Sequence, residues 1–182
     1  MKILIAFGSS EGQTRKIAKY IAEKIGGEGH EPDIYDCGRR PHGREVASYD
    51  AIIIAASVHQ EDHQESAVAF AVAHREQLEA KPSAFISVSL SAAFENGAKD
   101  AQRYIERFTE ATGWQPAVCL MTGGALKLSE YDFFKEQIIR YVVMAGRDVP
   151  ADRKDWEFTD WAALDAFLAK FLADAQERLQ QA

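Results

Sequence analysis

The stretch ILIAFGSSEGQTRKIAKYIAEKI, residues 3–25, decides the fold. Its first part, residues 3–7, is a continuous apolar run without alternation, which is typical of a strand buried on both faces of a parallel sheet. Residues 14–25 place apolar side chains at helical spacing and predict an amphipathic helix that glycines end at 26, 27 and 29. A buried strand that passes into a helix through a short polar loop predicts an α/β fold.

The same alternation continues along the chain. Further strands are predicted at 32–37, 50–57, 84–90 and 117–121, and further helices at about 64–79, 98–112 and 161–179. Right-handed crossovers between such strands give a parallel sheet with helices on both faces. Five strands without a second dinucleotide-binding half favour the flavodoxin-like strand order 2-1-3-4-5. The helix at 64–79 is expected to bury Val68, Phe70, Ala71 and Val72.

Length and composition set limits on the function. The chain has 182 residues, a formal charge of −7 and a pI near 5.3. It contains no Lys/Arg run that could neutralise a phosphate backbone, so nucleic acid is not expected as a partner. No segment approaches the roughly 20 apolar residues of a membrane span, and the N-terminus resembles a first strand and not a signal peptide, so we expect a cytoplasmic protein. Cys37 and Cys119 form no CxxC motif and are expected to be free thiols.

An insertion separates the last predicted strand from the closing helix. It covers about 126–155 and contains the amphipathic segment YDFFKEQIIRYVVMAG. We expect it to belong to a single flavodoxin-like domain over 1–182. Its apolar face has three interpretations, which are packing onto the domain, a homodimer surface, and contact with a membrane surface. The residues of this face are Phe133, Phe134, Ile138, Ile139, Val142 and Val143.

The candidate site lies at the carboxyl ends of the strands, where open α/β sheets bind ligands at the switch point of the strand order. Three loops meet these ends, at 8–14, 56–59 and 89–93. The first loop, GSSEGQT, is rich in small hydroxyl and glycine residues and precedes a helix, which is the composition of a phosphate cradle. It contains neither GxGxxG nor GxxxxGK[ST]. The alternative is an ordinary capped turn between strand and helix.

The run SSEGQT at 9–14 resembles the phosphate loop of flavodoxins. That resemblance implies FMN as the cofactor, with its 5′-phosphate bound by the hydroxyls of Ser9, Ser10 and Thr14 and by the N–H groups of Glu11, Gly12 and Gln13. It also implies that the other loops flank the isoalloxazine ring. Their residues are Ala56, Ser57, Val58 and His59, then Ser89, Leu90, Ser91, Ala92 and Ala93, together with Gly123, Gly124 and Ala125.

More specifically, almost the whole chain is similar to the menaquinone-dependent protoporphyrinogen IX dehydrogenase family. The matching segments are EGQTRKIA at 11–18, ASVH at 56–59 with His63 and Gln64, PSAFISVSL at 82–90, GGAL at 123–126, YDFFK at 131–135 and FTDW at 158–161. The resemblance implies oxidation of protoporphyrinogen IX to protoporphyrin IX with a quinone acceptor, in haem biosynthesis. A lipid-soluble quinone would suit the membrane alternative for the insertion, with peripheral contact at the inner face of the cell membrane. The chain departs from the family pattern at Glu61, often Gly there, and at 144–150.

A porphyrinogen carries propionates, so basic residues of the insertion are candidate substrate ligands. Lys127, Arg147 and Arg153 are the main candidates, and Lys135, Arg140 and Lys154 are further ones. The alternative is an exposed, solvated basic loop. His59 is expected near the flavin ring, where it hydrogen-bonds or shapes the substrate gap. Its spacing to His63 also fits a metal pair, but no third ligand is evident and no metal is expected.

Two other functions remain open at this point. The first is a flavodoxin-like electron carrier without an organic substrate, which the acidic charge suits because carriers dock on basic partners. The second is a binding or regulatory module that has lost its flavin, against which the intact phosphate loop argues. In the enzyme interpretation the flavin performs the redox chemistry, so no further catalytic constellation is required.

Overall fold

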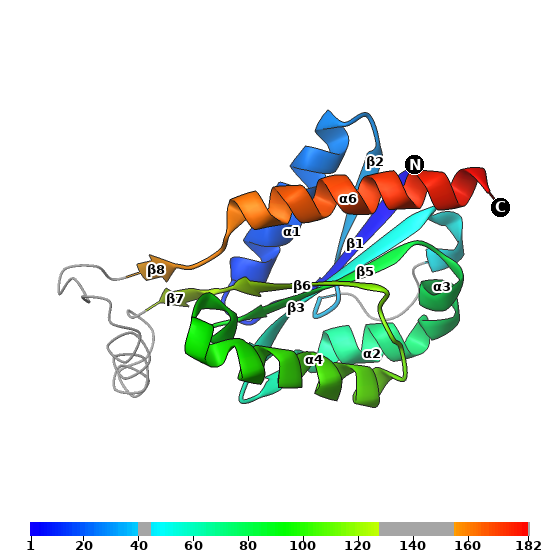
Figure 1. The fold of residues 1–182 in the computed structure, drawn as a ribbon. Coiled ribbons are helices and arrows are strands. Elements are labelled where there is room, and N and C mark those ends of the chain that lie inside the picture. The colour runs from blue at the N-terminus through cyan, green and yellow to red at the C-terminus, as the bar shows by residue number, and fades with distance from the viewer. Residues whose placement is uncertain (40–44, 128–154, 182) are drawn as a thin grey trace.

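The computed structural model describes residues 1–39, 45–127 and 155–181. Its centre is a sheet of five parallel strands (Figure 1). The strands are β1 (Lys2–Gly8), β2 (Glu31–Asp36), β3 (Ala51–His59), β5 (Ser83–Ser89) and β6 (Val118–Gly123). They lie in the order β2-β1-β3-β5-β6. The predicted flavodoxin-like order is therefore confirmed, because β4 (Asp62–His63) pairs antiparallel with the end of β3 and adds no parallel strand.

Helices cover both faces of the sheet (Figure 1). One face carries α1 (Gln13–Gly27) and α6 (Trp161–Gln180), and the other carries α2 (Glu65–Ala73), α3 (Arg75–Ala80) and α4 (Ala98–Thr112). Three short 3-10 turns span Val46–Ser48, Ser91–Ala93 and Glu95–Gly97. Because neither face of the central strands meets water, their side chains are apolar on both sides, as the uninterrupted runs in the sequence indicate.

Successive residues of each strand serve opposite halves of the core. In β1, Ile3, Ile5 and Phe7 pack in the cluster with α1 and α6, whereas Leu4 and Ala6 pack in the cluster with α2 and α4. This follows from the two-residue period of a strand. The buried sheet fixes the register of β1 against β3, in which Gly8 lies opposite Ala56. The carboxyl ends of the strands consequently lie next to one another at one edge.

The helix predicted at 64–79 differs from the observed structure. It consists of α2 and α3, separated at His74, whose φ of −119° and ψ of 23° leave helical geometry. Its buried residues include Ala67, Phe70 and Ala71, but Val72 is 52% exposed, so its predicted burial was wrong. Ala67, Phe70 and Ala71 follow the i, i+3, i+4 spacing of one helical stripe, and position 72 lies about 100° further round the helix.

Two short strands, which pair with each other, flank residues 128–154 of the predicted insertion. β7 (Ala125–Lys127) pairs antiparallel with β8 (Asp155–Glu157), and both continue past the carboxyl end of the sheet (Figure 1). The apolar face predicted for the insertion falls in 128–154, outside the described residues. None of the helices in the described part of the chain is long and apolar enough to cross a membrane.

Candidate cofactor site

The loop at 9–14 joins the end of β1 to the start of α1. Gly12 has a φ of +92°, a left-handed conformation in which glycine is favoured, and its N–H donates to Ser9 Oγ at 3.0 Å. The N–H of Lys16 donates to Gly12 O at 3.0 Å and begins the helical ladder. The amides of the preceding first turn therefore have no acceptor within the helix, and together with the helix dipole they favour an anion there.

Thr14 is the observation that best fits the loop to a phosphate. Its side chain is completely buried, and its Oγ1 has no hydrogen-bond partner among the described residues. A buried hydroxyl without a partner destabilises a fold by about 1–3 kcal/mol, so a ligand that accepts a hydrogen bond from Thr14 Oγ1 would stabilise this loop. Arg15, in the first turn of α1, forms an ion pair with Asp36 at 2.9 Å. Its charge is therefore already paired and is not needed as a cationic ligand of the phosphate.

The second predicted loop, residues 56–59, is a strand. β3 continues through His59 because β4 folds back on it, with Val58 opposite His63 and His59 opposite Asp62. The expectation of a loop at these four residues was therefore wrong. The chain reverses at Gln60 and Glu61, whose φ values of 51° and 69° are those of a tight hairpin turn. These two residues form the β3–β4 turn.

The buried side chain of His63, in the strand that follows this turn, anchors the turn to the core. His63 is 6% exposed, its Nε2 lies 2.9 Å from Ser87 Oγ, and its ring packs edge-on against Phe85 and Phe108 at 5.1 and 5.2 Å between centroids. Burial lowers the pKa of His63 to about 4, against a smaller opposing effect of Asp62, so the ring is neutral near pH 7. His59 is exposed. The described residues contain no group of three or more His, Cys, Asp or Glu that could hold a metal ion.

The third loop follows β5 and is fixed by short polar contacts. Ser89 Oγ accepts from Ala92 N at 3.1 Å, and Ser89 O accepts from Gly124 N at 3.2 Å. Ser91 is buried and its Oγ lies 3.3 Å from the hydroxyl of Tyr104 on α4. These contacts hold the loop at 89–93 beside the end of β6, which places Gly123 and Gly124 at the same edge of the sheet.

Hydrogen bonds also link the loops to one another. Ser57 Oγ donates to Gly8 O at 3.5 Å, and Gln64 Nε2 donates to Ser10 Oγ at 3.4 Å. On the other side of the loop at 9–14, Gln13 Nε2 donates to Thr159 Oγ1 at 2.8 Å, which in turn donates to Gly123 O at 2.9 Å. These bonds join residues 8–13 to the end of β3, to the start of α2 and to the end of β6.

A model of the family described as "Flavodoxin domain" matches residues 4–153. The chain belongs to the flavodoxin domain family. The protoporphyrinogen IX dehydrogenase [quinone] of Escherichia coli (strain K12) is 29% identical to this flavodoxin-domain chain over 168 residues, which are 92% of each chain. A protein of the same name from Leishmania major is 26% identical over 94% of this chain and 75% of its own length.

Solved structures agree on the fold of this flavodoxin domain. A flavodoxin of Streptococcus pneumoniae TIGR4 has a TM-score of 0.55 at 16% identity, over 96% of this chain and 99% of its own. Rubredoxin oxygen:oxidoreductase of Desulfovibrio gigas has a TM-score of 0.60 at 13% identity, over 98% of this chain but 37% of its own length. These structures share the fold, and membership in the flavodoxin domain family indicates flavin binding.

Several residues of the flavodoxin-domain site were not predicted, and other predicted ones have no described position. Gln64 and Thr159 are new members, although both lie within segments, HQ and FTDW, that carried the family resemblance. Of the candidate substrate ligands, Lys127 ends β7, where it lies opposite Asp155 of β8. The other five, Arg147 and Arg153 among them, fall in 128–154, outside the part of the chain that the structure describes.

Proposed function

We propose that this protein binds FMN and oxidises protoporphyrinogen IX to protoporphyrin IX, with a quinone as the electron acceptor. The observation that carries the proposal is the buried hydroxyl of Thr14 at the start of α1, which has no hydrogen-bond partner in the described part of the chain and fits a cofactor phosphate. The substrate and acceptor are suggested by the names of relatives that align over most of the chain.

Each part of the site would have a separate task. The hydroxyls of Ser9, Ser10 and Thr14 and the first-turn amides would hold the phosphate, without a charged side chain. The β3–β4 turn and the loop at 89–93 would enclose the ring from two sides and exclude water, with Gly124 beside them after β6, while Gly123 allows the close approach of Phe158. Bound FMN would supply the redox chemistry, so the protein's contribution is binding, orientation and tuning of the potential.

His59 is a candidate for contact with the substrate or the ring, because it is exposed at the end of β3 beside the turn. Lys127, with Arg147 and Arg153 of the segment outside the described residues, would pair with propionates of the porphyrinogen. We further propose that the protein works in the cytoplasm and that the inserted segment contacts the inner face of the cell membrane, where a quinone is available, or a second copy of the chain.

The test is an anaerobic titration of the FMN-loaded protein. Protoporphyrinogen IX is added first and a menaquinone analogue second, while the visible absorption band of oxidised flavin is followed. Bleaching by the porphyrinogen and recovery with the quinone are the expected results. A protein that binds FMN but keeps it oxidised in the presence of the porphyrinogen would contradict the substrate and favour an electron carrier. A protein that binds no FMN would contradict the cofactor.

A further inference from the structure

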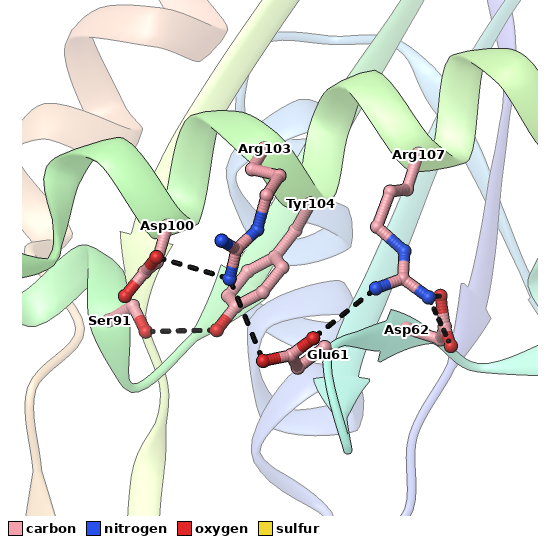
Figure 2. A network of polar contacts seen from close by, with 7 residues as sticks. All are labelled: Glu61, Asp62, Ser91, Asp100, Arg103, Tyr104 and Arg107. Carbon is pink, nitrogen blue, oxygen red and sulfur yellow. Dashed lines mark hydrogen bonds and ion pairs between the residues drawn. The ribbon is translucent and has the colours of Figure 1, made fainter.

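Two arginines of α4 hold the turn on the ring side of the site. Arg107 forms ion pairs with Glu61 at 3.3 Å and with Asp62 at 2.8 Å, and Arg103 lies 3.6 Å from the same Glu61 carboxylate and 3.2 Å from Asp100 (Figure 2). The two arginines are four residues apart and therefore share one face of the helix. Together these groups form an alternating network of opposite charges across the gap between α4 and the β3–β4 turn.

The same helix also contacts the loop at 89–93, which would lie on the opposite side of a bound flavin ring. Between the two arginines, Tyr104 contacts Ser91 through its hydroxyl, and Figure 2 shows this contact next to the arginine network. A single rigid helix thus contacts both segments that would enclose the ring. Its position sets the distance between them.

The β3–β4 turn has a conformational reason to need such support. Gln60 and Glu61 both adopt left-handed φ values, although neither is a glycine. That conformation is disfavoured for residues with a Cβ, so it persists where the surroundings fix it. Single exposed ion pairs contribute little, but Arg107 binds two carboxylates at once and Arg103 extends the network, which is the arrangement in which surface pairs do stabilise.

We propose that Arg103 and Arg107 are positioning residues that hold the β3–β4 turn at the correct distance from the loop at 89–93 to receive the flavin ring. This inference rests on the proposed flavin binding. It assigns a purpose to Glu61, which pairs with both arginines.

The test compares Arg103→Gln, Arg107→Gln and the double variant with wild type in two independent measurements. The first is hydrogen exchange of the turn amides in the flavin-free protein, which needs no cofactor. The second is the dissociation constant for FMN and for riboflavin, which lacks the phosphate. We expect faster exchange at residues 58–63 and about 5-fold weaker binding of both ligands by the double variant. A merely general loss of structure would instead raise exchange in all strands.

Two further variants control for charge and for folding. Arg107→Lys keeps the charge but loses the bidentate geometry of the guanidinium. Its effects on turn exchange and flavin binding should be intermediate. Arg75→Gln removes an ion pair of similar exposure with Glu79 on α3 and should change neither measurement. Unchanged turn exchange and unchanged riboflavin binding in the double variant would overturn the proposal. If wild type bound no flavin, the proposed function would fail, while unchanged turn exchange alone would still show that the arginines do not hold the turn.

Discussion

The loop at 9–14 and the β3–β4 turn approach the same edge of the sheet, but different forces hold them. The loop depends on backbone amides, hydroxyls and the buried side chain of Thr14. The turn depends on exposed ion pairs with α4 and on the buried side chain of His63. The phosphate side should therefore respond weakly to salt and pH, whereas the ring side should respond to both. The predictions below test that difference.

The largest effect is expected where a side chain would force the ring-side loop open. A Cβ on Gly97 would lie 2.3 Å from Ser91 O, a backbone atom that cannot move without its loop. Gly97→Ala should lower the free energy of unfolding by about 3 kcal/mol, measured by urea denaturation. Gly27→Ala is the control, because a Cβ there meets nothing within 4 Å. Equal stability of the two variants would show that the loop at 89–93 is not tightly fixed.

Acid should weaken the turn before it weakens the phosphate loop. Because the pKa of His63 falls from 6.5 to about 4 on folding, its neutral form stabilises the fold fully above pH 6.5. That contribution is lost as the pH falls from 6.5 to 4 and amounts to about 3 kcal/mol. The protection factors of the amides at 57–64, which are corrected for the intrinsic pH dependence of exchange, should fall over this range well before those at 8–14.

A variant without the titrating ring checks this assignment. His63→Phe retains a ring between Phe85 and Phe108, and Ser87→Ala in the same chain removes the hydroxyl that would otherwise lose its partner. The double variant should lose the part of the pH dependence between 6.5 and 4. If its stability falls with pH as steeply as that of wild type, carboxylates and not His63 cause the acid sensitivity.

The two sides also differ in how well the sequence predicts them. The loop at 9–14 follows from local pattern, because its hydroxyl and glycine residues stand between a clear strand and a clear helix. The turn does not, because its position depends on β4, a strand of two residues that no periodicity indicates. Arg103 and Arg107 lie 42 and 46 residues after Glu61 in the sequence, and such pairing becomes visible when α4 packs beside β4. Gln64 and Thr159 were missed for the same reason, since their partners are distant in the chain.

Removing the buried hydroxyl tests the phosphate side alone. Thr14→Val keeps the shape of the side chain but deletes the unpartnered Oγ1. The flavin-free protein should be as stable as wild type or more stable, because a buried unsatisfied group is lost. FMN should bind about 30-fold more weakly, since a hydrogen bond to a charged phosphate contributes about 2 kcal/mol. Riboflavin binding should not change, whereas the arginine variants should weaken the binding of both ligands. A proportional loss of riboflavin affinity would place Thr14 near the ring instead.

The smallest expected effect is a salt dependence of riboflavin binding. It tests the ring side alone, because the phosphate loop is not mutated. Screening between exposed charges increases strongly from about 0.05 to 0.5 M ionic strength, so the network of Arg103 and Arg107 should loosen. Riboflavin is the correct probe because it carries no phosphate, whereas FMN binding to a chain of net charge −7 also changes with salt through long-range repulsion. We expect riboflavin to bind wild type about 2-fold more weakly at the higher salt, and the Arg103→Gln/Arg107→Gln variant with no such change. Equal salt dependence in both proteins would mean that the network is too weak to position the turn, and that His63 alone supports the ring side.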